Sequence, residues 1–292
     1  MPKMRLHHVD VFTNERFGGN PLAVFLDADG LSDELMQKIA REMNLSETTF
    51  VQTPKQREHA ALVRIFTPGQ ELPFAGHPTV GTAFVLTRLG LVNAPQFTFE
   101  EGVGPVGLRR GDEPDFFWMQ PPLPPVDATF HDTAGIAAAL GLSAGEIAAP
   151  ARSIGAGLLN FLCVALRSKS AVDDLRIDRE KLVTPTSEKA AFGDLLIFHY
   201  ASGSAHSRMF AHPDSGIGED PATGSSVAPL VFALYHGGLL EPECASLVVE
   251  QGTKMRRQSF LHARFTRDAK GAPSNIEVGG RSIFVFEATL EL

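Results

Sequence analysis

The feature that most constrains the fold of this 292-residue chain is a set of segments that occurs twice. Residues 20–26 and residues 160–166 each follow a Gly-rich turn, begin with Asn and continue as an apolar run typical of a buried strand. Residues 72–86 and residues 218–234 are two Gly-rich entries to an apolar helix. Because each segment recurs at nearly the same distance along the chain, the sequence predicts two similarly built halves. The echoes are short, and coincidence is the alternative.

The length of the chain is consistent with two units, since domains usually have about 100–200 residues. The Pro-rich segment 120–125 is the best candidate for a linker, because such a backbone is stiff and is not committed to a sheet. We therefore expect one half over residues 1–122 and a second over residues 123–292, with the last strand able to return to the first half.

The composition predicts a well-packed globular protein and argues against several kinds of partner. Hydrophobic residues make up 43% of the chain and charged residues 21%, which excludes a disordered chain. The formal net charge of −8 argues against binding to nucleic acid or to an anionic membrane. The N-terminus lacks the apolar stretch of a signal peptide, and no apolar run approaches the ~18–20 residues that cross a bilayer. We therefore expect a cytoplasmic protein.

Several familiar motifs are absent or do not fit their context. Two cysteines cannot make a disulfide framework, and Cys163 lies in an apolar run where we expect it to be inert. The histidines lack the spacing of a zinc site, so no metal ion is expected. Residues 102–107 match G-x-G-x-x-G, but Pro105 and the strand-like residues after it indicate a hairpin turn rather than a dinucleotide site.

The two Gly-rich helix starts have the same physical content. Gly76-His77 and Gly224-Ser225 allow an anion to approach backbone N–H groups that have no partner inside the helix. Pro78 suits the first helical position, which would make His77 the N-cap. If the halves face each other, both helix ends could hold one small carboxylate in a shared cleft. The alternative for each segment alone is an ordinary helix start.

Glu47 is the candidate general acid/base. It precedes the apolar residues Phe50 and Val51, directly after an amphipathic helix that Ser32 is expected to cap. Partial desolvation there would raise the pKa of its carboxyl towards that of a useful base. The alternative is a solvated Glu near a helix end. Asp220, just ahead of the second helix, could cap that helix or bind a substrate amino group, and capping is the stronger reading.

Six segments, in this order, resemble the PhzF-type isomerases of phenazine biosynthesis. They are GNPLAVF at 19–25, REMNLSETTFV at 41–51, RIFTP at 64–68, LPFAGHPTVGTA at 72–83, SRMF at 207–210 and EDPATGSS at 219–226. The resemblance implies an α/β fold of the diaminopimelate-epimerase type. In that fold two pseudo-symmetric domains each wrap a curved, mixed or antiparallel sheet around a central helix. It also implies a homodimer and no cofactor.

The same resemblance assigns roles to residues at the cleft. Glu47 falls on the catalytic glutamate of the family. The positions of substrate binding or proton transfer are occupied by Gly76, His77, Asp220, Gly224 and Ser225. We count Glu47, His77 and Asp220 as catalytic candidates. The substrate-binding candidates are Asn20, Gly76, Gly224 and Ser225.

The activity implied is the isomerisation of trans-2,3-dihydro-3-hydroxyanthranilate, in which Glu47 moves a proton from C3 of the ring to C1. Related epimerases use two thiols, and neither Gly-rich loop here contains Cys, which makes that chemistry improbable. The segment 200–206 is less bulky and less basic than in the phenazine enzymes, a departure that bears on the substrate more than on the reaction class. Two alternatives stay open, a non-catalytic module that binds small acids and an epimerase that uses Glu47 with a non-thiol acid.

Overall fold

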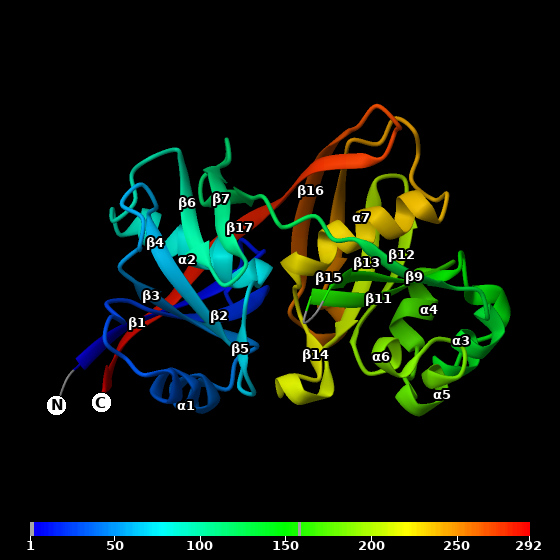
Figure 1. Ribbon diagram of the computed structural model, residues 1–292, viewed down its shortest axis with the longest axis horizontal. Coiled ribbons are helices and arrows are strands. Elements are labelled where there is room, and N and C mark those ends of the chain that lie inside the picture. Colours follow the sequence, from blue (N-terminus) through cyan, green and yellow to red (C-terminus); the bar gives the residue numbers. More distant parts are fainter. Residues whose placement is uncertain (1–2, 157–158) are drawn as a thin grey trace.

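The computed structural model describes residues 3–156 and 159–292, and these residues form a 17-stranded sheet with helices on its curved faces (Figure 1). The Gly-rich turn expected before Asn160 includes residues 157 and 158, which lie outside the described residues. The strands fall into two groups that are joined through the last strand, β17 (Pro273–Glu291). We call these groups the first half and the second half.

The first half is a ring of strands around one helix. Its strands are β1 (Lys3–Val11), β2 (Asn20–Phe25), β3 (Glu47–Gln52), β4 (Ala61–Phe66), β5 (Glu71–Leu72), β6 (Gln96–Glu101), β7 (Gly104–Arg110) and β8 (Phe116–Met119), and its helices are α1 (Asp33–Met43) and α2 (Gly76–Arg88). The pairings run β1–β2–β3–β4–β6–β7–β8, and β17 closes the ring by pairing with both β8 and β1. Helix α2 packs inside this ring (Figure 1).

The second half repeats the same connections. Its strands are β9 (Val126–Phe130), β10 (Ala151–Ala156), β11 (Leu159–Leu166), β12 (Asp194–Ala201), β13 (Ser204–Phe210), β14 (Glu219–Asp220), β15 (Ser246–Gln251) and β16 (Ser259–Arg267). Its helices are α3 (Thr133–Ala139), α4 (Lys169–Asp174), α5 (Arg179–Val183), α6 (Glu188–Ala191) and α7 (Val227–His236), with 3₁₀ turns η1 (Ala144–Glu146), η2 (Pro213–Ser215), η3 (Gly224–Ser226) and η4 (Thr253–Met255).

The order of parallel and antiparallel pairs shows the internal symmetry. In the first half, β2 pairs with β3 and β4 with β6 in parallel. In the second half, β11 pairs with β12 and β13 with β15 in parallel. In each half a helix follows the second strand of a hairpin and a second, central helix precedes the next parallel strand. The predicted architecture of two similar halves, each a curved sheet around a central helix, is confirmed.

The central helices are buried because their sequences are apolar almost all round. Every residue of α2 from Gly76 to Leu86 is buried, and α7 packs against strands of the second half and against β17. The N-cap of α2 is Ala75, with an extended backbone and no side-chain cap bond. The prediction that His77 is the cap is therefore wrong. Pro78 is tolerated as the third helical residue because the first four N–H groups of a helix lack partners.

Strand β17 connects the two halves. Its first part pairs with β16 of the second half and with β8, and its last part pairs with β1 along the whole of that strand. In Figure 1 this red strand runs from the second half across to the first, so that both chain ends lie side by side. The boundary at residue 122 stays an expectation.

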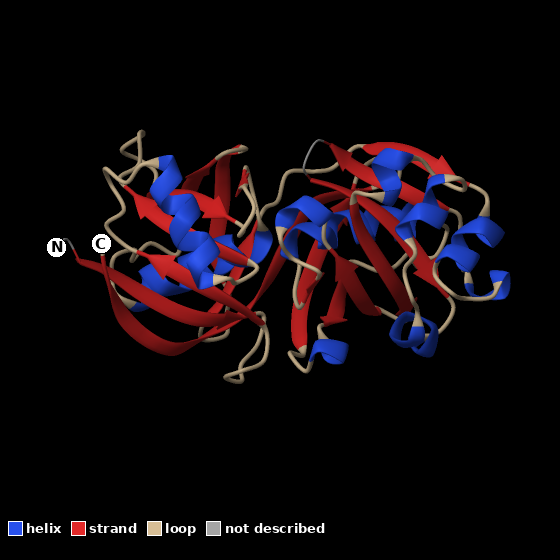
Figure 2. Ribbon diagram, turned by 90° about the horizontal axis from the view of Figure 1, so that it is seen from below, coloured by secondary structure: helices blue, strands red, loops and turns tan. Residues whose placement is uncertain are grey.

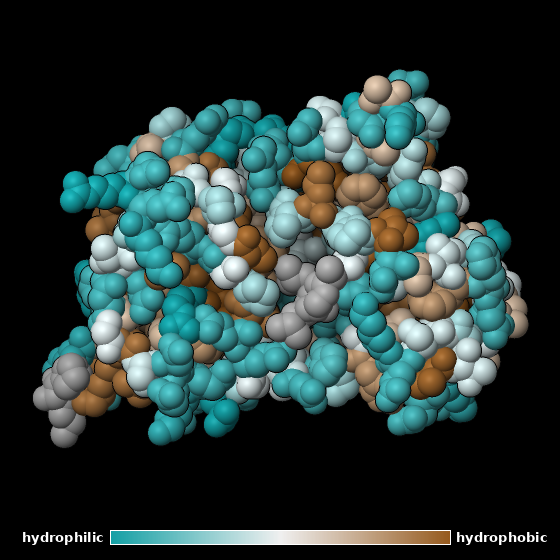
Figure 3. Space-filling model, in the orientation of Figure 1, coloured by the Kyte–Doolittle hydropathy of each residue, from teal (hydrophilic) through white to brown (hydrophobic). Residues whose placement is uncertain are grey.

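The remaining local predictions concern turns and surface. Ser32 caps α1 by accepting a hydrogen bond from the N–H of Leu35, as expected. The segment beginning at Gly102 is a hairpin turn between β6 and β7, and Cys163 is buried, both as predicted. Within the described part of the chain, no helix has the length and apolarity to span a membrane. The face in Figure 3 is largely hydrophilic, with apolar side chains scattered over it.

Candidate active site

A cavity of about 520 Å³ lies between the two halves. From the first half it is lined by residues of β3, of the β4–β5 turn, of β5 and of the start of α2. From the second half it is lined by residues of β11, α6, β12, β13, η2, β14 and η3. Seen from below in Figure 2, the two halves lie side by side with helices close to their junction. The cavity brings together Glu47, Gly76, His77, Asp220, Gly224 and Ser225.

The starts of the two central helices touch each other. A Cβ atom on Gly76 would lie 2.5 Å from the Cα and carbonyl carbon of Gly224, and one on Gly224 would lie 2.9 Å from Cα of Gly76. Real Cβ atoms essentially never come so close to backbone, so both positions require Gly. The second helix begins as the 3₁₀ turn η3 and continues as α7. The backbone at 76–77 and at 224–225 thus faces one cavity.

Glu47 begins β3 and is 8% exposed, at the wall of the cavity. Burial raises the pKa of its carboxyl well above the usual range, and the nearby charges of Asp220 and Asp194 raise it further. Among the described residues, its Oε2 atom has no hydrogen-bond partner and lies 3.4 Å from Nδ1 of His77. The parallel pairing of β2 with β3, in which Leu22 lies opposite Glu47, fixes this position.

His77 is a buried, neutral imidazole in the first turn of α2. Its side chain is 2% exposed, and burial lowers the pKa of the ring to about 3. Nδ1 lies 3.0 Å from Nδ2 of Asn20. A neutral ring can accept or donate a hydrogen bond at Nδ1 towards Glu47 without placing a cation in the cavity.

Asn20 lies behind the cavity rather than on its wall. It is completely buried at the start of β2 and is not among the lining residues. Its amide donates to Oδ1 of Asp220 at 2.8 Å and to the backbone oxygen of Ala222 at 3.0 Å. Direct contact between Asn20 and a substrate stays a prediction, and in this structure Asn20 holds residues of the second half against the first.

Asp220 ends the two-residue strand β14 and is 3% exposed. Its Oδ2 accepts a hydrogen bond of 2.5 Å from the hydroxyl of Thr223, so its carboxylate binds the loop before η3 rather than capping the N–H groups of the helix. Burial raises the pKa of Asp220, and the hydrogen bonds from Thr223, Ser46 and Asn20 oppose that shift. The loop bond makes the helix-capping interpretation of Asp220 wrong.

Asp194 and Gln251 also belong to the site and were not among the residues predicted from the sequence. Asp194 begins β12 as Glu47 begins β3, lines the cavity and accepts a hydrogen bond of 2.7 Å from the N–H of His212. Burial raises the pKa of Asp194 to about 6, and the bond from His212 limits the rise. The other is Gln251, at the end of β15, whose amide donates to Thr223 and to the backbone oxygen of Asp220.

The internal repeat of the sequence contains a signal for both residues. Asp194 precedes an apolar strand run just as Glu47 does, and Gln251-Gly252 repeats the Glu101-Gly102 pair at the end of β6. Neither signal is visible without knowing that the halves correspond strand by strand.

The arrangement suits proton transfer on a bound acid. Backbone N–H groups at two helix starts favour a carboxylate. An acid of raised pKa beside them can exchange a proton near neutral pH. In the described ranges 3–156 and 159–292, no three His, Cys, Asp or Glu side chains are grouped so that they could hold a metal ion.

Comparisons with known proteins agree with this geometry. A family model described as phenazine biosynthesis-like protein matches residues 9–288. An uncharacterized isomerase of Mesorhizobium japonicum is 36% identical over 294 residues, covering 96% of each chain. The trans-2,3-dihydro-3-hydroxyanthranilate isomerase of Pseudomonas aeruginosa is 38% identical over 281 residues, covering 93% of this chain and 94% of that protein. The crystal structure of a PhzF-family protein of Bacillus anthracis covers 100% of both chains with a TM-score of 0.86 and 25% identity.

Proposed function

The chain belongs to the family of phenazine biosynthesis-like proteins and is an isomerase, and from this premise we propose that it moves a proton on a small cyclic amino or hydroxy carboxylic acid. The substrate that we propose first is trans-2,3-dihydro-3-hydroxyanthranilate. A relative 38% identical to this chain has that compound in its name.

One observation carries the proposal: Glu47 and the backbone of both central helix starts line the same cavity. The first N–H groups of a helix have no partner inside it. Those at 76–77 and 224–225 are therefore available to a carboxylate, and each helix end adds roughly half a positive charge. A ring bound by its carboxylate would place its neighbouring carbons beside Glu47.

The reaction begins when ionised Glu47 removes the proton from C3 of the ring. The electron pair of the C3–H bond forms a double bond between C3 and C4, and the double bond between C4 and C5 moves to C5 and C6. The π electron pair of the double bond between C6 and C1 then takes a proton at C1, and the single bond between these carbons remains. Glu47 returns this proton, directly or with His77 and Asp220. The resulting enol at C3 tautomerises to the ketone. No atom is gained or lost, so the step is an isomerisation.

The site would lower the barrier in two ways. Negative charge that spreads from the ring onto the carboxylate is stabilised by the N–H groups at the helix ends, which are already oriented. Burial and the charges of Asp220 and Asp194 raise the pKa of Glu47, which makes it a stronger base once ionised. His77, whose pKa burial lowers to about 3, stays neutral and leaves the negative charge of the base uncompensated.

The test is proton exchange in D₂O. Purified protein given trans-2,3-dihydro-3-hydroxyanthranilate should change the ultraviolet absorption of the substrate. NMR should show deuterium at C1 to the extent that Glu47 exchanges its proton with solvent before returning it. Glu47→Gln should abolish both signals and leave ligand binding close to that of the original protein. Glu188→Gln, which changes an exposed acid that also lines the cavity, is the matched control and should keep the activity.

The outcomes separate the candidate functions. An unchanged rate in Glu47→Gln would remove Glu47 from the mechanism. Tight binding of the acid without turnover in the unaltered protein would identify a binding module in place of an enzyme. Deuterium at the carbon next to the carboxylate of an amino acid, with inversion, would identify an epimerase. The same assay over a panel of cyclic and linear amino and hydroxy acids would define the substrate.

A further inference from the structure

Gln251 ends β15 and is 1% exposed, and it touches the site only through other residues. Its side-chain nitrogen lies 2.7 Å from the backbone oxygen of Asp220 and 3.0 Å from Oγ1 of Thr223. A backbone oxygen only accepts hydrogen bonds, so the NH₂ group of the amide must face it. Both amide hydrogens are then used, one on Asp220 and one on Thr223.

This assignment leaves the hydrogen of the Thr223 hydroxyl available for the next hydrogen bond. Oγ1 of Thr223 accepts from Gln251, and its single hydrogen is left for Oδ2 of Asp220 at 2.5 Å. The other oxygen of Asp220 accepts from Asn20, whose NH₂ group must likewise face the carbonyl of Ala222. Both carboxylate oxygens of Asp220 therefore have a donor directed at them, the hydroxyl of Thr223 at Oδ2 and the amide of Asn20 at Oδ1.

Glu47 has the opposite environment. Among the residues that the structure describes, no hydrogen-bond donor reaches its Oε2 atom, which lies 3.4 Å from Nδ1 of the His77 ring. Of two carboxyl groups that share a cavity, the one supplied with donors keeps the charge and the one without them keeps the proton.

We propose that Gln251 is a positioning residue that acts through Thr223. It keeps Asp220 as the ionised member of the pair, so that the proton exchanged with the substrate resides on Glu47. This inference rests on the proposed proton shift at the same site and adds the residue that decides which carboxyl group carries the proton.

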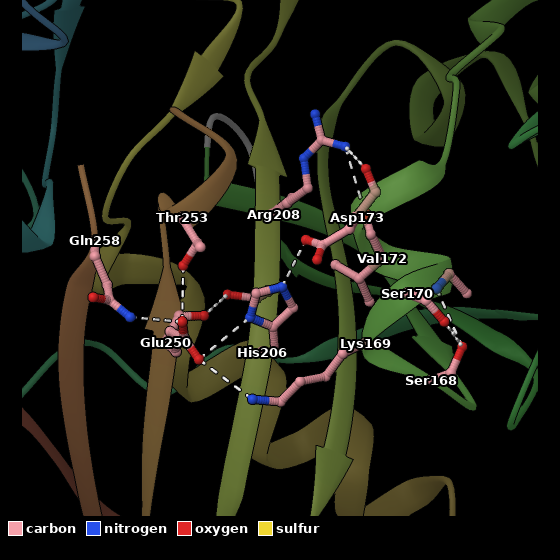
Figure 4. A network of polar contacts seen from close by, with 12 residues as sticks. Ser168, Lys169, Ser170, Val172, Asp173, His206, Arg208, Glu250, Thr253 and Gln258 are labelled. Atoms are coloured by element: carbon pink, nitrogen blue, oxygen red, sulfur yellow. Dashed lines mark hydrogen bonds and ion pairs between the residues drawn. The ribbon is translucent and has the colours of Figure 1, made fainter. Parts of the chain in front are cut away.

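The position of Gln251 is itself fixed from the opposite face of β15, because neighbouring strand residues point to opposite sides. Glu250 accepts hydrogen bonds from Thr253 and Gln258, each at 2.8 Å, and lies 3.5 Å from the buried ring of His206 (Figure 4). His206 in turn lies 2.9 Å from Asp173 of α4. This network holds the end of β15 against β13, and Gln251 then reaches the site from a rigid strand.

The other charged groups at the cavity include Lys189, which binds Asp127 at 3.0 Å, and the exposed Glu188. Asp194 of β12 faces the cavity and is bound by the N–H of His212. Glu219, the neighbour of Asp220 in β14, forms two hydrogen bonds of 2.8 Å with the guanidinium of Arg208. With His77 neutral, the charge of Asp220 is the main group that a change at Gln251 would alter.

The experiment compares the pH dependence of deuterium incorporation, as kcat/KM, between variants. The rate should rise with pH as Glu47 loses its proton. Gln251→Met frees the Thr223 hydroxyl, so Asp220 takes up a proton more readily and repels the charge of Glu47 less. The rising limb of the plot of kcat/KM against pH should move to lower pH by about one unit. This is the size expected for the loss of one neighbouring charge. Thr223→Val should shift the limb similarly, and the double variant should shift it no further.

Controls distinguish positioning from a general loss of structure. Thr223→Ser keeps the hydroxyl and should restore the original profile. Gln52→Met changes a Gln at the end of a strand in the first half, where its amide binds the backbone oxygen of Ala28, and should leave the limb in place. A Gln251→Met protein that is slower, with the limb unmoved, overturns the inference. If that variant does not fold, Thr223→Val with an unmoved limb overturns it equally.

A second measurement does not need turnover. Side-chain ¹³C NMR of the ligand-free protein over a pH series, assigned with Glu47→Gln and Asp220→Asn, should show Asp220 losing its proton at lower pH than Glu47. Reversed ionisation would overturn the inference. If this result holds while the substrate is not turned over, the proposed reaction fails and the assignment of the proton stands.

Discussion

Glu47 and Asp194 begin corresponding strands of the two halves, β3 and β12, and both line the cavity, yet their surroundings differ. Asp194 accepts a backbone hydrogen bond from His212, and its pKa is raised only to about 6. Glu47 lies close to a neutral imidazole, and burial raises its pKa well above the usual range. The fold of the two halves is repeated, and the two acids differ in the hydrogen-bond donors that reach them.

The ends of β6 and β15 make the same comparison. Glu101 ends β6 and accepts a hydrogen bond of 2.7 Å from Thr79, in the first turn of α2. Gln251 ends β15 and donates to Thr223, just before η3. An acid supports one helix start and an amide supports the other. Two similar halves can therefore build one asymmetric site.

The largest effect that tests this comparison is at the two acids themselves. Glu47→Gln should lower kcat by about 10²–10⁴-fold, the usual contribution of a general acid/base. Asp194→Asn should cost about tenfold or less and should move the rising limb of the pH profile to lower pH, because it removes a charge that raises the pKa of Glu47. Steady-state kinetics of both variants measure the ratio of their losses in kcat. Equal losses would show that the halves are functionally alike.

The next effect concerns the contact between helix starts. Gly76→Ala places a Cβ atom 2.5 Å from backbone of Gly224, so the halves must separate locally. We expect a loss of about 1–3 kcal/mol in the free energy of unfolding, as for other overpacked sites, and a loss of carboxylate binding. Denaturant unfolding and calorimetric titration measure the two effects.

Gly145→Ala is the matched control, since a Cβ atom there meets only the Ser143 hydroxyl, at 3.9 Å. It should change neither stability nor binding appreciably. A Gly76→Ala protein as stable and as tightly binding as this control would show that the helix starts need not touch.

The repeated fold and its two helix starts are easier to predict from the sequence than the residues that differ between the halves. Glu47 and the two helix starts are predictable because their signals are local in the sequence. Apolar neighbours indicate the desolvation of Glu47, and Gly residues indicate the close approach of backbone. Gln251 has no such local signal: it follows Asp220 by many residues, and only the pairing of β13 with β15 brings it near. His77 was misplaced as a cap because Ala75 caps α2 by backbone geometry alone, which no side chain indicates.

The smallest effect concerns stability at the first-half counterpart of Gln251. Burial raises the pKa of Glu101 to about 8 from an ordinary 4.5. The folded state therefore holds a proton that the unfolded state has lost, and stability should fall as pH rises from about 5 to about 8. Glu101→Gln should remove this dependence and raise Tm at pH 8 relative to the unaltered protein, with little change at pH 5.

Thermal unfolding followed by circular dichroism at both pH values is the measurement. The amide introduced by this substitution can donate to Thr79 as Gln251 donates to Thr223, so the variant makes the two halves more alike. A Glu101→Gln protein that loses stability at pH 8 would mean that the carboxyl group is needed in its charged form.

The most direct test of the account is the crystal structure of the Glu47→Gln variant with trans-2,3-dihydro-3-hydroxyanthranilate bound. The account predicts the carboxylate within about 3 Å of backbone nitrogens from both helix starts, at 76–77 and at 224–225. It also predicts C3 of the ring within about 3.5 Å of the substituted side chain at position 47. A carboxylate held at the cavity mouth by Lys189, or by one helix start alone with the ring turned away from position 47, would contradict it.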